Sequence, residues 1–349
     1  MISFVVPAHN EQSCLGRTLE AIHDSARSLN QPYEIVVVDD ASTDATDKVA
    51  REHQATVVSV NHRQIAATRN SGARAASGER LFFVDADTTI NSKVVASAMR
   101  AMDNGAAGGG APPRFEGIVP LFARLLLWWV NFFMRLAGIT GGACMFCTRE
   151  AFRATGGFDE RLFGAEDAAF AWAIKQEGPF VVLWRYVHTS GRRVRGMGGL
   201  QMLTALVRMA FFPSMLKKRE AVSKIWYDSN REGDDSTAHS WGVQVSNAIL
   251  LVIVTAFVTG PLWMFIPWSL TPEGSLLFKI RIGVAILSCH VGLVLWPCAY
   301  LLFRILLRQK RWIERIKLAV LIALCLWFAW GATREVYFFW VWLYSWLAS

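Results

Sequence analysis

Residues 33–44 read YEIVVVDDASTD and residues 80–88 read RLFFVDADT, so each stretch begins as an apolar run and ends in carboxylates. Apolar runs also stand at 2–6 and 56–60, and polar stretches with helical spacing lie between the runs, at 11–29, 45–53 and 65–76. Strands that are apolar throughout are typical of a parallel sheet covered by helices on both faces. We therefore predict an α/β domain of the nucleotide-binding, Rossmann-like type.

The residues that follow the predicted strands form the candidate site, because ligands bind beyond the carboxyl ends of such strands. Asp85 and Asp87 lie on one side of a tight turn, where two carboxylates can hold a divalent cation, Mn²⁺ or Mg²⁺, against a diphosphate leaving group. A carboxylate at Asp40 suits a base or ribose. Ser42 and Asp44 are typical of a turn and a helix cap.

Glycine and cysteine patterns carry little chemistry in this chain. The run GAAGGG at 105–110 lacks the GxGxxG spacing, so we predict a glycine-rich strand or turn at a close backbone approach. Cys144 and Cys147 form a CxxC pair without a second pair or a nearby His, and we expect buried free thiols. The first residues, MISFVVPAHNE, have no basic leader, so we expect no signal peptide and a cytoplasmic first domain.

The net charge of +8 is concentrated in the apolar C-terminal third. Residues 237–349 carry nine Lys and Arg against three Asp and Glu, whereas residues 1–236 carry 27 against 25. Basic residues of this kind flank membrane helices. A nearly neutral first domain argues against nucleic-acid binding, and we expect no nucleic-acid partner.

Long uncharged stretches at 240–272 and 282–303, and a shorter one at 318–333, predict a helical transmembrane region over 237–349. We expect about three spans, near 243–268, 282–303 and 318–345, of which the third is left open. The basic loop RQKRWIERIK at 308–317 places the preceding domain, residues 1–230, on the cytoplasmic side. Segments near 118–139 and 196–219 resemble amphipathic helices lying on the membrane surface. Arg334 and Glu335 either pair within the membrane, mark the acceptor path, or lie at an interface.

Five motifs carry a family resemblance: PAHNE at 7–11, VVDDASTD at 37–44, AATRNSGARAASGE at 66–79, FFVDADT at 82–88, and GGACMFCTREAFRATGGFDERLFGAEDAAF at 141–170. In this order, over roughly residues 1–195, they resemble the family 2 glycosyltransferases, inverting enzymes with a GT-A fold. The resemblance implies a nucleotide pocket lined by Pro7, Ala8, Asn10, Glu11 and Asp40. It also implies that Arg69 lies near the base or diphosphate, that Asp85 contacts ribose or the metal, and that Asp87 binds the metal.

The resemblance places the acceptor end at the Gly-Gly-Phe segment 156–158 and the pair Glu166 and Asp167, with Asp167 as general base. Inverting transfer needs one carboxylate that deprotonates the acceptor hydroxyl while the nucleoside diphosphate leaves from the opposite face of the sugar. His188 is a candidate further metal ligand, with a structural role as the alternative. Arg192 and Arg193 are expected at the phosphates, with contact to lipid as the alternative.

These observations predict a membrane-bound, metal-dependent inverting glycosyltransferase. Its expected partners are a nucleotide sugar (UDP by resemblance, with GDP possible), membrane lipids, and a lipid or lipid-linked acceptor at the cytoplasmic face. No QxxRW-type signature follows Asp167, so a single transfer is favoured over chain elongation. The alternatives are a catalytically silent nucleotide-sugar sensor or scaffold, and an enzyme of polysaccharide synthesis with a non-lipid acceptor.

Overall fold

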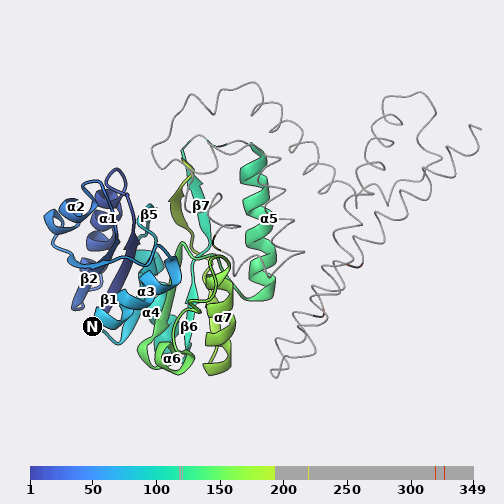
Figure 1. Ribbon diagram of the computed structural model, residues 1–349. Coiled ribbons are helices and arrows are strands. Elements are labelled where there is room, and N and C mark those ends of the chain that lie inside the picture. The colour runs from blue at the N-terminus through green and yellow to red at the C-terminus, as the bar shows by residue number, and fades with distance from the viewer. Residues whose placement is uncertain (118, 120, 193–218, 220–318, 320–325, 327–349) are drawn as a thin grey trace, which may run out of the picture. The chain divides into compact units, whose positions relative to one another are not determined.

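The computed structural model describes residues 1–117, 119 and 121–192, and the single positions 219, 319 and 326 (Figure 1). The three expected spans and the interfacial segment near 196–219 lie outside these residues, apart from the single positions, and so does Arg193. No helix within the described ranges is long and apolar enough to cross a membrane. The three spans therefore stay predictions.

A mixed, mainly parallel sheet forms the centre of the described domain (Figure 1). Its strand order is β3-β2-β1-β4-β8-β6-β9. The strand β8 runs antiparallel to both of its neighbours, β4 and β6, and the other adjacent pairs are parallel. The predicted α/β class with a mainly parallel sheet is thus confirmed. The strands are β1 (Ile2–Ala8), β2 (Tyr33–Asp40), β3 (Thr56–Val60), β4 (Arg80–Val84), β6 (Gly108–Gly110), β8 (Cys144–Thr148) and β9 (Phe180–Val182).

Helices cover both faces of this sheet, as the unbroken apolar strands predict. Alternate residues of each strand point to opposite faces, so Phe4 and Val6 join one apolar core and Val5 joins the other. The first core is closed by α1 (Leu15–Arg27), α2 (Thr46–Glu52) and α4 (Ser92–Asp103). The second is closed by α3 (Ile65–Ala75), α6 (Arg149–Thr155) and α7 (Glu166–Glu177).

The helix α3 packs unusually close to the sheet, and Gly72 makes this possible. A Cβ atom at Gly72 would lie 2.3 Å from Val5 Cγ1 and 2.7 Å from Val38 Cγ2, which are distances that real Cβ atoms do not show. The close contact places α3 directly over β1 and β2. Side chains at the N-terminal end of α3 are thereby brought to the carboxyl ends of these strands.

The glycine run is a strand, as predicted. Gly108–Gly110 form β6, between β8 and β9. A Cβ atom at Gly109 would lie 2.2 Å from the carbonyl oxygen of Val181, so the close backbone approach that the sequence indicated is confirmed.

The CxxC pair consists of two buried free thiols, also as predicted. Cys144 and Cys147 both lie in β8 and are fully buried. Burial raises the pKa of Cys144 to about 12, and it raises the pKa of Cys147 as well. Thiols that stay protonated are inert as nucleophiles and as metal ligands.

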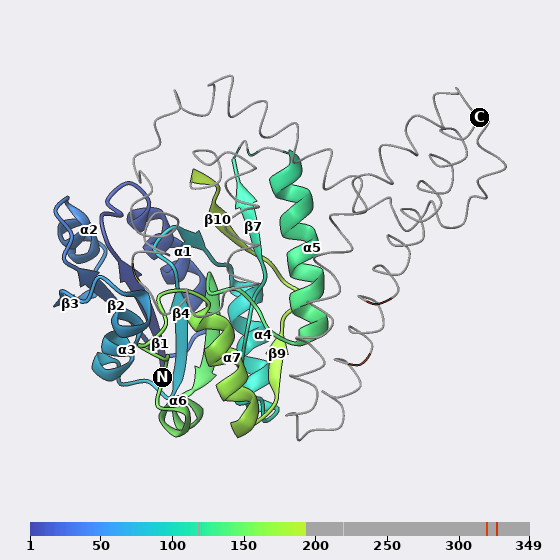
Figure 2. The same ribbon diagram turned by 45° about the vertical axis from the view of Figure 1, so that its right-hand side comes forward.

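A second, small sheet with the order β5-β10-β7 lies beside the helix α5 (Leu121–Ala137), as Figure 2 shows. Its strands are β5 (Thr88–Thr89), β7 (Pro113–Glu116) and β10 (Val187–Ser190). The Asn131 side chain on α5 donates to the carbonyl of Pro113, at 2.9 Å. The helix expected at 118–139 is thus present, and its contact with a membrane stays a prediction.

Arg149, at the start of α6, caps the carboxyl end of α3 from a buried position. Its Nε donates to the carbonyl of Gly78 at 2.7 Å, and its two Nη atoms donate to Ala73 at 3.2 Å and Ala76 at 2.8 Å. The residue is only 7% exposed. A cation among these carbonyls also complements the negative end of the helix dipole.

Replacing Arg149 by Met is expected to lower the free energy of unfolding by about 3 kcal/mol, because three carbonyls lose a charged donor where water has little access. Arg153→Met is the matched control on the same helix, since Arg153 is exposed. Thermal unfolding of the full chain measures both variants. Equal midpoints for the two variants would contradict the capping role.

Candidate active site

The carboxyl ends of β1, β2 and β4 bring the predicted site residues together. Pro7 and Ala8 end β1 and are buried beside Val38 and Asp39 of β2. Asn10 joins the two loops that follow, since its Oδ1 accepts from the backbone N–H of Thr43 at 2.8 Å. Asp44 stabilises a turn, since its Oδ1 accepts from the backbone N–H of Thr46 at 3.0 Å, but the N-cap of α2 is Ala45, so the predicted cap is wrong.

Three of these loops contain a non-glycine residue with left-handed backbone. Asn10, Ala41 and Arg63, after β1, β2 and β3, have φ values of 52°, 56° and 51°. Such residues cost about 1 kcal/mol or more each and persist where the surroundings hold them. These three residues lie at the candidate site, whereas Asn30 and Gln54 adopt the same conformation after α1 and α2.

Asp40 anchors the loop that leads into α3, and its contact with a nucleotide stays a prediction. Its Oδ1 accepts from the backbone N–H groups of His62 and Arg63, at 2.7 and 2.8 Å. Its Oδ2 accepts from the N–H of Gln64 at 3.2 Å and from the hydroxyl of Thr68 at 2.8 Å. With four donors on two oxygens and 5% exposure, the carboxylate anchors the loop that leads into α3.

Arg69, on α3, is buried between two acids from distant parts of the chain. Its Nη2 lies 2.8 Å from Asp85 Oδ1 and its Nη1 lies 2.9 Å from Glu166 Oε1, and the residue is 2% exposed. Its Nη2 also donates to the carbonyl of Gly142 at 3.2 Å, and its guanidinium lies 5.3 Å from the ring centre of Phe158. Burial lowers the pKa of Arg69, but Asp85 and Glu166 outweigh burial and raise it.

Glu166 and Asp167 begin α7, directly after Ala165, whose φ of 58° is again left-handed. Burial, followed by the negative charge of Asp167, raises the pKa of Glu166 to about 7, although Arg69 acts in the opposite direction. Asp167 is half-buried, and its Oδ1 accepts from the N–H of Ala168 at 2.7 Å. The two neighbours thus differ in burial, with Asp167 the more accessible to a substrate.

Asn70, the residue after Arg69, fixes the Gly-Gly-Phe segment. Its Oδ1 accepts from the N–H of Phe158 and its Nδ2 donates to the carbonyl of the same residue, both at 2.9 Å. Gln64 at the start of α3 donates to the carbonyl of Leu162 at 3.0 Å. The acceptor-side loop is therefore held by the same helix that carries Arg69.

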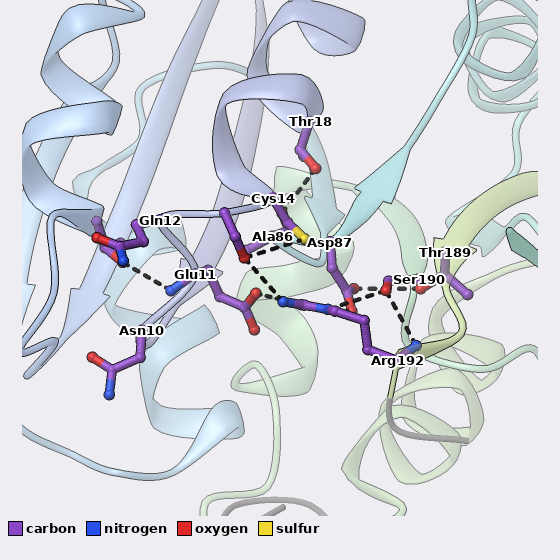
Figure 3. A network of polar contacts seen from close by, with 12 residues as sticks. Asn10, Glu11, Gln12, Cys14, Thr18, Ala86, Asp87, Thr189, Ser190 and Arg192 are labelled. Atoms are coloured by element: carbon purple, nitrogen blue, oxygen red, sulfur yellow. Dashed lines mark hydrogen bonds and ion pairs between the residues drawn. The ribbon is translucent and has the colours of Figure 1, made fainter. Parts of the chain in front are cut away.

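Arg192 connects the loops after β1 and β4 (Figure 3). Its Nη2 lies 2.6 Å from Glu11 Oε2 and 3.5 Å from Asp87 Oδ2. Burial lowers the pKa of Arg192, but the charge of Glu11 outweighs this and raises it. Arg192, which the resemblance places at the phosphates, thus contacts both Glu11, a predicted residue of the nucleotide pocket, and Asp87, a predicted metal ligand.

His188 lies apart from this group, in β10. Its Nδ1 is 3.7 Å from Glu116 Oε1, and its side chain is half exposed. Within the described ranges, no three or more His, Cys, Asp and Glu side chains are grouped so that they could hold a metal ion. A three-ligand set of Asp85, Asp87 and His188 is therefore not assembled here. Two carboxylates still suffice where a cation takes its other ligands from water and phosphate.

Several contacts of the site were not predicted from the sequence. Thr189 donates to Asp87 Oδ1 at 3.3 Å, and the Ser190 hydroxyl accepts from Arg192 Nε at 3.1 Å. Thr18 donates to the carbonyl of Ala86, between the two aspartates, at 2.8 Å. Small hydroxyl residues carry no motif of their own, so only the folded geometry reveals these roles.

The raised pKa of Glu166 makes a prediction about stability and pH. Between about pH 4.5 and 7 the folded chain keeps a proton that the unfolded chain releases, so the unfolding free energy should fall as pH rises through this window. Glu166→Gln removes that contribution. The melting temperature of the wild type should therefore fall more steeply with pH than that of the variant. Glu52→Gln, at an exposed site, should keep the wild-type slope, and a Glu166→Gln slope equal to it would contradict the assignment.

Residues 3–153 match the family model described as Glycosyl transferase family 2. Validoxylamine A glucosyltransferase of Streptomyces hygroscopicus is 32% identical over 108 residues, which cover 29% of this chain and 25% of that protein. The undecaprenyl-phosphate 4-deoxy-4-formamido-L-arabinose transferase of Yersinia enterocolitica is 33% identical over 94 residues, covering 25% and 28%. The chain thus matches only about a quarter of the length of these relatives.

A mannosyltransferase of Pyrobaculum calidifontis, solved with GDP-Man and Mn²⁺, covers 96% of this chain and 86% of its own at 18% identity and a TM-score of 0.46. The match to the family model spans β1 through β8, with Asp85, Asp87 and Arg69 inside it. By residues 3–153 the chain is therefore similar to the enzymes of glycosyltransferase family 2.

Proposed function

We propose that this chain transfers a sugar from a nucleotide sugar to an acceptor hydroxyl, with inversion at the sugar carbon and with the help of a divalent cation. The observation that carries the proposal is the buried Arg69, which joins Asp85 on the donor side to Glu166 on the acceptor side. Two reactants can meet only if both sets of groups share one site. UDP is the proposed nucleotide.

Asp167 is the proposed general base. It stands next to Glu166 at the start of α7 and is the less buried of the two. A carboxylate in this position can take the proton of the acceptor hydroxyl as its oxygen attacks the sugar. Glu166 is assigned the supporting role, since its contact with Arg69 fixes the start of the helix that carries the base.

Asp85 and Asp87 are the proposed ligands of Mn²⁺ or Mg²⁺, and the donor diphosphate would complete the set. Both are oxygen donors at the end of a buried strand, as these hard cations require, and Asp85 keeps 34% of its side chain exposed. When bound, the cation would neutralise charge on the departing diphosphate. His188 is retained only as a possible further ligand, and Arg192 and Arg193 as phosphate contacts.

A lipid or lipid-linked acceptor at the cytoplasmic membrane face is the proposed second substrate. The chain is similar to transferases whose names give undecaprenyl phosphate and 4,4'-diaponeurosporenoate, both lipids. The apolar region at 237–349 and the amphipathic α5 also favour an integral membrane enzyme. A non-lipid acceptor is the alternative, because another relative is named a poly(ribitol-phosphate) beta-glucosyltransferase.

Two substitutions separate the proposed roles. Asp167→Asn should lower the transfer rate by about 10² to 10⁴, which is the range for a lost general base, while leaving the affinity for UDP with Mn²⁺ nearly unchanged. Asp87→Ala should weaken that binding and abolish transfer. Calorimetric titration with UDP and Mn²⁺, and transfer from a panel of labelled nucleotide sugars to a membrane lipid extract, measure the two effects.

The control is Asp47→Asn, which changes an exposed carboxylate on α2 that pairs with Arg51. It should behave as the wild type in both assays. Wild-type transfer by either site variant would contradict the assigned roles. Donor binding by the wild type without turnover of any sugar in the panel would favour the sensor or scaffold instead.

A further inference from the structure

Arg192 occupies the end of the candidate site at which the cation is proposed to bind. It follows β10 and reaches back to two loops that precede it by more than 100 residues (Figure 3). Its Nη2 donates to Glu11 at 2.6 Å and to Asp87 Oδ2 at 3.5 Å. One positive group thus faces two carboxylates, and one of these is a proposed metal ligand.

The arrangement around Arg192 is built and shielded. Ser190 and Ser13 accept from its Nε and Nη1, at 3.1 and 3.3 Å, which sets the direction of the guanidinium. The side chains of Arg192 and Asp87 are each 14% exposed, and that of Glu11 is 5% exposed. Because solvent screens such buried charges weakly, each partner depends on the others for compensation.

With Arg192 in this position, binding of a metal ion to Asp87 is electrostatically unfavourable. A divalent cation bound through Asp87 would lie close to the guanidinium, and the two positive groups would repel each other. This repulsion is reduced if the guanidinium turns away from Asp87 and pairs with another anion. A donor diphosphate, held against the same cation, is an anion of that kind.

We propose that Arg192 is a positioning residue that competes with the divalent cation for Asp87 in the donor-free enzyme and pairs with the donor diphosphate once the donor is bound. The inference rests on the proposed function, and it describes how binding of the cation depends on binding of the donor. It follows that the metal ion alone binds the enzyme weakly. Each of the metal ion and the nucleotide binds more strongly when the other is already bound to the enzyme. Without donor, Arg192 keeps Glu11 and Asp87 compensated.

The test uses two titrations of the full chain with opposite expected signs. In Arg192→Gln, the affinity for Mn²⁺ alone, followed by the paramagnetic resonance of free Mn²⁺, should rise about tenfold because a nearby positive charge is lost. The affinity for UDP in saturating Mn²⁺ should fall about tenfold because a charged phosphate contact is lost. A variant that merely disturbs the site would weaken both.

Two further variants complete the design. Arg192→Lys keeps the charge and should leave Mn²⁺ binding near that of the wild type, and Arg185→Gln, at an exposed arginine, should change neither titration. Unchanged or weaker Mn²⁺ binding by Arg192→Gln would overturn the competition while leaving the proposed function intact. Absence of Mn²⁺ binding from every variant, with or without UDP, would overturn the proposed cation and the competition together.

Discussion

The buried guanidinium of Arg69 is the constraint on which the described domain depends. A charge that is 2% exposed is tolerable only with full compensation, and the compensation comes from Asp85 at the end of β4 and Glu166 at the start of α7. Loss of the arginine would leave Asp85, Glu166 and Asp167 without their shared counter-charge. Its Nε has no hydrogen-bond partner among the described residues, which is a further cost of this position. The fold and the site therefore depend on the same interaction, that of Arg69 with Asp85 and Glu166.

The helix α3 positions Arg69 and connects it to the other loops of the site. Gly72 lets the helix lie against β1 and β2, so Arg69 reaches the strand ends. Asp40 fixes the entry to the helix, and Asn70 fixes the segment that leads towards α7. Strained residues such as Ala165 persist because these contacts over-determine the loops. The geometry around Arg69 is thereby set before any substrate arrives.

The sequence predicts most of the fold and only part of the site, for a physical reason. Apolar runs reveal which strands are buried, and because these runs are unbroken they indicate that helices cover both faces of the sheet. The helix expected from residue 11 begins at Leu15, because residues 12–14 form a turn in which the carbonyl of Glu11 accepts from Cys14 and Leu15. Likewise, a carboxylate such as Asp40 carries no mark that tells ligand from loop: its donors come from the loop after β3, which sequence spacing cannot place. His188 is paired with Arg114 and Thr89 in the small sheet and lies near Glu116, and sequence spacing does not reveal this pairing.

Charge balance explains why this site would require a cation before it could accept a diphosphate. Arg69 and Arg192 interact with five carboxylates, those of Glu11, Asp85, Asp87, Glu166 and Asp167, which leaves an excess of three negative charges when all are ionised. The raised pKa of Glu166, about 7, relieves part of this excess near neutral pH. An anionic donor would still meet net repulsion, whereas a divalent cation cancels the remaining excess. The two arginines then divide the work by burial. Arg69 is the more deeply buried of the two, whereas on Asp87 a metal ion could take the place of Arg192, and Arg192 could then pair with a phosphate.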